Sequence, residues 1–377
     1  MKFENIIVNS VPSITWNWLQ SNKDVITVEG DFSEKKADYK SLPAAVKIST
    51  TKTPENFPFI PTGVFNKSTP KVKDNRNADG SITETRQYQD QGNAEHPLVD
   101  FLNQTMPEAE YLEISGKAEE PVILNYDFKK ASVSKQIIHA KENSEATVIF
   151  MFTGNAEASI LQTKVYAEAN SKLHIIKVQL MGEITLQLDD TGIAADDNAD
   201  VKYTLIELGG LHVDNGLHVN LNGYQSKFTA NSAYICQKNQ YYDFNHTVYH
   251  FGKKSECQMR VNGTIKDDAK KTYRGTLDFK KGCAGSAGNE LEETLILSPT
   301  ALNKSLPVIL CDEDDISGEH GASIGRLGAD VLFYMQTRGI SKEEAEKLMA
   351  HAKVQAVVDL IPSDEIKDQI KEFLDKQ

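Results

Sequence analysis

Two histidines with the spacing of a helical zinc pair are the first residues in this chain that suggest metal chemistry. His246 and His250 are separated by three residues, which on a helix would place both imidazoles on one face. The segment that holds them, 245–250, reads NHTVYH and is rich in strand-forming residues. On a strand, four residues span about 13 Å, which is too far for two ligands of one ion. A zinc enzyme built on this pair is therefore disfavoured, and the chain has no HExxH motif.

Four cysteines offer thiolate ligands, but no two of them form a CxxC pair. They are Cys236, Cys257, Cys283 and Cys311, at separations of 21, 26 and 28 residues. Zinc ribbons and ferredoxin-type cluster sites need closer spacing. In a solenoid of stacked strands, such intervals could bring two thiols onto neighbouring turns about 5 Å apart. The alternative is that each cysteine is a small buried hydrophobic residue.

An acidic run followed by a histidine is a further candidate for metal binding. Residues 312–315 read DEDD, and Glu319 and His320 follow within a few residues. Carboxylate oxygens and imidazole nitrogens are ligands that suit iron. The alternative is a solvated loop at the end of the last strand.

The motifs of several common enzyme classes are absent from the chain. Neither GxGxxG nor GxxxxGK[ST] is present, so the chain should not itself be an ATPase, and no GxSxG marks a hydrolase. These absences remove the simplest ATPase and hydrolase hypotheses.

The composition indicates an ordinary globular protein, with 40% hydrophobic and 25% charged residues in a chain of 377. The 41 basic and 54 acidic residues give a net charge of −13, which argues against non-specific nucleic-acid binding. Residues 1–10 lack the pattern of a signal peptide, and no run approaches 18 apolar residues, so we expect no membrane partner. Four cysteines do not make a disulfide framework, so we expect the reducing cytoplasm.

The candidate residues must be positioned mainly by strands, because period-two alternation dominates residues 108–315. Leu217, Val219 and Leu221 alternate with polar residues, and the pattern recurs at 273–280. Turn signals separate such runs, for example Asn222-Gly223. Short strands over about two hundred residues leave a sandwich, a barrel or a solenoid. No repeat in the sequence chooses among them.

Two regions of different character flank these strands. Residues 1–107 are rich in proline and predicted to be irregular and partly helical, and the polar stretch 71–91 is predicted to be mobile. Residues 316–377 are predicted to form a helical domain. Ser341 and Glu344 match a capping box at the start of one helix, and Ser363 is expected to cap the next. These short helices must pack on the strands or on a partner.

Several spaced motifs, in order, resemble the signature of one known family. The stretch 314–349 carries HGA at 320–322, LFY at 332–334 and RGI at 338–340. Upstream, TYRG at 272–275 and the segment 111–125 are also similar. From about residue 111 to the C-terminus, the chain thus resembles the SufB/SufD family of iron–sulfur cluster assembly scaffolds. In that family the histidine motif forms a turn after the last acidic strand end.

The resemblance implies a right-handed parallel β-helix at 108–315, followed by a helical domain. It also implies a heterodimer with a SufB-like paralogue, or a homodimer in isolation, and docking of a SufC-type ABC ATPase on the helices. The residues expected at that docking surface are Leu332, Phe333, Tyr334, Arg338 and Gly339.

The resemblance also points to residues near a cluster. His320 matches a histidine that faces the partner, where it would ligate iron or orient a neighbouring ligand, and Glu319 is a second candidate for the same site. Cys311 and His250 are further candidates. Because the resemblance implies a scaffold, we predict no catalytic residues and do not expect an enzyme. We expect no tightly bound cofactor, only a transient iron–sulfur cluster at the interface.

Two positions indicate which branch of the family the chain resembles. Leu291 stands where SufB-like chains carry a cluster-holding cysteine, and Gly321 stands where they carry an acidic residue. Both favour a SufD-like member, although Glu319 and the segment 272–275 look SufB-like. The alternatives are a SufB-like or self-pairing scaffold and, in another class, a β-helix enzyme acting on polysaccharides. The latter needs paired carboxylates on a strand, and none is obvious.

Overall fold

The computed structural model describes residues 1–12, 21–40, 42–52, 57–65 and 96–377. The polar stretch 71–91, predicted to be mobile, lies outside the described residues.

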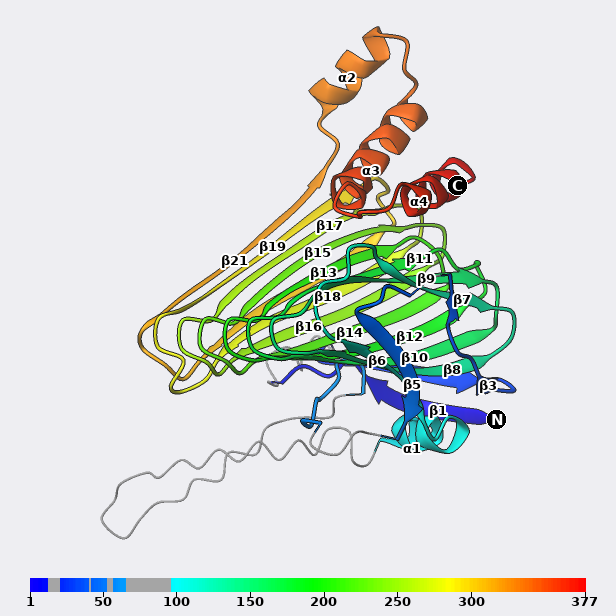
Figure 1. The fold of residues 1–377 in the computed structure, drawn as a ribbon. Helices are drawn as coiled ribbons and strands as arrows, with labels where there is room; N and C mark the ends of the chain where they lie inside the picture. The colour runs from blue at the N-terminus through cyan, green and yellow to red at the C-terminus, as the bar shows by residue number, and fades with distance from the viewer. Residues whose placement is uncertain (13–20, 41, 53–56, 66–95) are drawn as a thin grey trace.

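The core is a β-solenoid of about 8 turns, in which two parallel sheets face each other (Figure 1). From β6 to β21 the strands alternate between the sheets. The even-numbered strands of this range lie in one sheet, here called the even sheet, and the odd-numbered ones lie in the odd sheet. The even sheet contains β6 (Ala109–Ile114), β8 (Ser132–Ala140), β10 (Ala158–Ala167), β12 (Leu186–Ala195), β14 (His212–Leu221), β16 (Tyr241–His250), β18 (Lys270–Phe279) and β20 (Leu302–Cys311). The odd sheet contains β7 (Val122–Phe128), β9 (Glu145–Gly154), β11 (Lys172–Gln179), β13 (Asp200–Glu207), β15 (Lys227–Cys236), β17 (Glu256–Ile265), β19 (Ser286–Ile296) and β21 (Ile316–Arg326). The predicted β-helix is confirmed, and the sandwich and barrel are excluded.

The turns of the solenoid differ in length. Ala158 pairs with Leu186, 28 residues further along the chain, whereas Lys270 pairs with Leu302, 32 residues further. Because the step varies, no fixed period is visible in the sequence. Inward-facing apolar side chains from both sheets form one continuous core.

One corner of the solenoid is built from residues in the left-handed conformation, one per turn. This corner column consists of Asn143, Asn170, Asn198, Gln225 and Lys254, with φ between 50° and 60°. Each amide donates to a carbonyl of the next turn, as Asn170 does to Asp197 at 2.8 Å. Asparagine tolerates this conformation better than most residues, which explains its recurrence here.

Helices cover the outer face of the odd sheet. The apolar sides of α3 (Lys342–Val358) and α4 (Asp364–Asp375) pack on outward residues such as Ile176 and Ile206, with Val354 and Ile370 buried in the contact. Since this contact buries helix residues from both elements, it meets the expectation that the helices pack on the strands.

The N-terminal region covers the even sheet. A hairpin of β1 (Lys2–Val8) and β2 (Asp24–Glu29) lies with α1 (Pro97–Thr105) beneath the sheet in Figure 1. The short strands β3 (Ser33–Glu34), β4 (Asp38–Tyr39) and β5 (Val46–Thr51) join the solenoid. The described part of this region is therefore more ordered than the predicted irregular segment.

The two ends of the solenoid differ. At the first turn, β5 pairs antiparallel with β6, and β4 pairs antiparallel with β7. At the last turn, β20 and β21 stand at the ends of their sheets, and among described residues no strand pairs with their outer edges. The side chains of β21 are mostly exposed.

The start of the helical region differs from the prediction. β21 runs through Arg326, so the strand stack extends past the predicted boundary at 315, and residues 320–322 lie in a strand and not in a turn. The reason is that all of β21 pairs in register with β19. The first helix is α2 (Ala329–Thr337).

The predicted capping box of Ser341 and Glu344 is confirmed. Ser363 stands at the N-cap position of α4, but its side chain makes no capping hydrogen bond, so that prediction was wrong. None of the described helices is long and apolar enough to span a membrane.

Candidate functional site

His320 lies on β21, the last strand of the odd sheet, at the uncovered end of the solenoid. Its register partner on β19 is Glu290, a buried residue that faces the interior. Paired residues of a parallel sheet face the same side, so the His320 side chain extends toward the open interior. Glu319 therefore faces the opposite side, where its carboxylate accepts a hydrogen bond from Asn289 at 3.1 Å. The structure does not bring Glu319 and His320 together in one site.

A buried polar cluster lies directly behind His320. Burial raises the pKa of Glu290 to about 8, and its Oε2 has no hydrogen-bond partner among the described residues. Next to it, Glu292 forms an ion pair with Lys271 and accepts a hydrogen bond from Ser305 of β20. His320 is thus the exposed member of a row of polar residues that continues into the solenoid.

The two positions that indicated a SufD-like chain are neighbours in space. Leu291 on β19 pairs with Gly321 on β21, and a Cβ atom on Gly321 would lie 3.2 Å from the Leu291 side chain. A cysteine at 291 and a carboxylate at 321 would therefore stand side by side on the outer face of the sheet. In this chain the same place holds an isobutyl group and a glycine, which offer no metal ligand.

The acidic run lies apart from His320. Cys311 ends β20, is exposed, and contacts the Glu313 carbonyl at 2.9 Å. The Glu313 carboxylate accepts the backbone N–H of Gly282 at 2.8 Å, which lowers its pKa. From Ile316 to His320 the chain is extended, and those four steps along the strand span roughly 13 Å. The acidic run and His320 are therefore separate features.

His250 is a core residue on β16. Its Nδ1 lies 2.7 Å from the Ser255 hydroxyl, its ring stacks on Phe279 with centroids 4.5 Å apart, and burial lowers its pKa to about 4. His246 is on the same strand and is also fully buried. The structure does not place either imidazole beside His320.

The residues expected to contact an ATPase lie on and just after α2. This helix buries none of its side chains, and Phe333 and Tyr334 are 69% and 60% exposed. The Arg338 guanidinium lies 5.3 Å from the Tyr334 ring centroid, and Gly339 follows with φ of +85°. Leu332 is half-buried. In Figure 1, α2 stands away from the solenoid body.

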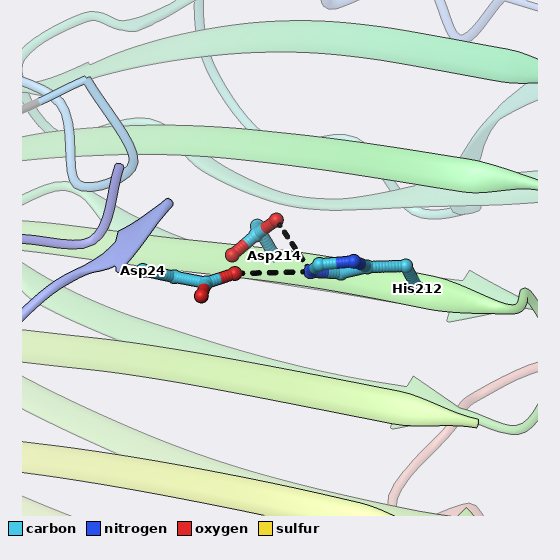
Figure 2. Close-up of side chains that lie close together, drawn as sticks. All are labelled: Asp24, His212 and Asp214. Atoms are coloured by element: carbon cyan, nitrogen blue, oxygen red, sulfur yellow. Dashed lines mark hydrogen bonds and ion pairs between the residues drawn. The ribbon is translucent and has the colours of Figure 1, made fainter. Parts of the chain in front are cut away.

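One group of metal-binding side chains was missed in the sequence. Asp24, His212 and Asp214 lie together where β2 meets the outer face of β14 (Figure 2). Burial alone would lower the pKa of His212, but the charges of Asp214 and Asp24 outweigh it and raise the pKa to about 10. The available signal was the His-x-Asp pattern at 212–214, which on a strand puts both side chains on one face.

A family model provides the decisive comparison. A model described as "SUF system FeS cluster assembly, SufBD core domain" matches residues 123–353, more than half of the chain. The chain belongs to the SufB/SufD family. That match covers the solenoid from β7 onward, together with α2 and most of α3.

Individual relatives favour the SufD-like branch. The SufD protein of Bacillus subtilis is 25% identical over 246 residues, which cover 64% of this chain and 56% of the relative. The SufD protein of Escherichia coli is 23% identical over 234 residues, covering 61% and 55%. The SufB protein of Bacillus subtilis is 26% identical over 142 residues, covering 38% and 30%. The chain thus spans little more than half the length of the SufD relatives that it matches.

Proposed function

We propose that this protein is a non-catalytic, SufD-like scaffold subunit that pairs with a SufB-like paralogue during iron–sulfur cluster assembly. The observation that carries the proposal is the uncovered end of the solenoid at β20 and β21. An unpaired strand edge presents a row of N–H and C=O groups that a strand of another chain can satisfy. Two such edges, one per sheet, suit a second solenoid of the same kind.

The exposed side chains at this end support the same partner. Ile324 on β21 is 45% exposed and Leu302 on β20 is 57% exposed. Apolar residues on an unpaired edge favour association, whereas natural edges that stay free often carry charge. At the other end, β4 and β5 pair antiparallel with the first turn, so the two ends of the solenoid are not equivalent.

The division of roles follows from the side chains at the end of the odd sheet. Because Leu291 and Gly321 offer no ligand, the paralogue would hold most of the nascent cluster. His320 would add an imidazole from this side of the interface, and the cluster would remain only until its transfer. The SufC-type ATPase would dock on α2 through Phe333 and Tyr334, since these rings are exposed. We place this assembly in the cytoplasm.

The pairing is tested by co-expression with a SufB-like paralogue. Ile324→Glu places a charge on the edge of β21, and we expect it to abolish the heterodimer in size-exclusion chromatography with light scattering. Ile184→Glu is the matched control, since Ile184 is also exposed, at 52%, and lies outside β20 and β21. If Ile324→Glu pairs as well as the control while both circular dichroism spectra match the wild type, the proposed interface is wrong.

The roles of His320 and α2 need separate assays. We expect His320→Ala to leave the heterodimer intact but to reduce cluster assembly on the complex, measured by visible absorption. Unchanged assembly would remove His320 from the site. We expect Phe333→Ala to weaken ATPase co-purification, with Phe59→Ala as the control because Phe59 is also exposed, at 61%. Cluster assembly by the purified chain without a paralogue would instead favour the self-pairing alternative.

A further inference from the structure

We propose that Asp24, His212 and Asp214 bind one divalent first-row transition-metal ion, which fastens the N-terminal hairpin to the even sheet (Figure 2). This site lies on β2 and β14, away from β20 and β21. It does not rest on the function proposed above, and either proposal can fail without the other.

The three side chains have the spacing of a metal-binding triad. His212 Nε2 lies 3.1 Å from Asp24 Oδ2 and 3.2 Å from Asp214 Oδ2, and the three candidate ligand atoms all lie within 4.8 Å of one another. Metal bonds to imidazole nitrogen and carboxylate oxygen are about 2.0–2.2 Å long, so neighbouring ligands of one ion stand roughly 3 Å apart. An ion can therefore enter with only small movements of these side chains.

Hydrogen bonding within the triad is incomplete without an ion. A single Nε2 nitrogen carries at most one hydrogen, which the geometry directs to Asp24. Asp214 is fully buried, and its Oδ2 has no hydrogen-bond partner among the described residues. The nearest polar group to this oxygen is His212 Nε2 at 3.2 Å, whose hydrogen is already directed to Asp24. A metal ion in place of the Nε2 hydrogen would contact both carboxylates at once.

The charges around the triad also favour a cation. Asp24, Asp214 and Asp243 face one another here, and the Arg274 guanidinium forms an ion pair with Asp243. Three carboxylates against one guanidinium leave two negative charges, and a protonated His212 offsets only one of them. A divalent ion bound to neutral imidazole would replace that proton and offset both charges. Asn9 holds the carboxylates in place, donating to Asp243 at 2.9 Å and to Asp214 at 3.4 Å.

The identity of the donors and their exposure narrow the kind of ion. One imidazole and two carboxylates, with no thiolate, suit Fe²⁺, Zn²⁺ or Mn²⁺ and disfavour Cu⁺. The side chain of His212 is 27% exposed and that of Asp24 is 15% exposed, so an ion can enter from solvent and water can complete its coordination.

The experiment uses the purified full chain, stripped of metal with a chelator and titrated with Zn²⁺ and with Co²⁺. We expect one ion per chain by mass spectrometry of the desalted protein, and a visible Co²⁺ spectrum. Asp24→Asn and His212→Gln should each bind at least about tenfold more weakly. His174→Gln is the matched control, because His174 is a partly exposed histidine of the solenoid that contacts Thr204.

A second measurement keeps the test informative if binding is weak. Hydrogen exchange of the β2 amides should slow when Zn²⁺ is added to the wild type, and not when it is added to Asp24→Asn, which preserves the shape of the side chain. His320→Ala should retain the ion, which separates this site from the interface. The proposal is overturned if the wild type binds no more metal than His212→Gln, or if Zn²⁺ leaves β2 exchange unchanged.

Discussion

Replacing Lys177 with methionine should cost this protein much of its stability, because the lysine is a charge buried at the centre of the solenoid. Its Nζ donates across the interior from β11 to Asp189, to Thr191 at 2.7 Å and to Thr163 at 3.1 Å. Both Lys177 and Asp189 are fully buried. Removing one partner of a buried ion pair leaves the other without compensation, which typically costs about 3–5 kcal/mol.

The magnitude follows from what remains at Asp189. Without the lysine, its carboxylate keeps hydrogen bonds from Thr191 at 3.5 Å and from Asn215 at 3.2 Å but has lost its cation. We therefore expect a loss of about 3–5 kcal/mol in the free energy of unfolding.

The assay is urea unfolding at pH 7 followed by far-UV circular dichroism. Lys172→Met on the same strand is the control, since Lys172 is exposed, and its cost should stay within about 0.5 kcal/mol. Adding Asp189→Leu to Lys177→Met should restore most of the stability, because no buried charge of the pair then remains. A Lys177→Met variant within about 1 kcal/mol of the wild type would refute the reasoning.

Three further predictions concern local structure. His246→Gln should be less stable than the wild type at pH 7, and this difference in unfolding free energy should shrink as the pH falls. Burial lowers the pKa of His246 to about 3, so the neutral histidine stabilises the fold above pH 6.5 and that stabilisation declines with acidification. The gap should narrow by about 2 kcal/mol between pH 7 and 5, and a constant gap would contradict this. In the corner column, Gln225→Val should lower the free energy of unfolding by about 1–2 kcal/mol and Gln225→Asn should not, because β-branched residues tolerate positive φ poorly. Equal urea midpoints for the two variants would contradict this prediction. In thermal unfolding, Ser341→Ala should lower the stability by about 1 kcal/mol and Ser363→Ala by far less, since of the two only Ser341 makes a capping hydrogen bond. A larger loss for Ser363→Ala would refute this prediction.

The sequence allowed the strands to be predicted where one face was apolar and the other polar, as at Leu217, Val219 and Leu221. The capping box at Ser341 was equally readable, because it depends on residues three apart. Both patterns involve residues close together in the sequence, so they can be recognised without knowledge of the tertiary contacts.

The rest depended on distant contacts. Lys177 and Arg274 are fully buried charges, which the alternation of polar and apolar residues would place at the surface. The residues that pair with these charges lie on other strands, so the sequence around Lys177 or Arg274 does not show how the buried charge is compensated. The family's turn at His320 became a strand because β19 offers a full-length partner. For the candidate sites, the motif found His320, but only the fold showed that Glu319 faces the other way.

The position of Asp24 against β14 has a consequence for how the chain is made. Asp24 and His212 are 188 residues apart, so at about 5–20 residues per second the hairpin waits roughly ten to forty seconds before its partner strand has been synthesised. During that time the apolar side of β1 and β2 can cover only the strands already made, which supply Val133, Ile160 and Leu188. Asp24 can meet His212 only after β14 has joined the growing stack, so this last contact of the hairpin should form late in folding, and a nascent chain stalled before residue 212 should leave the Asp24 end of β2 less protected from proteases.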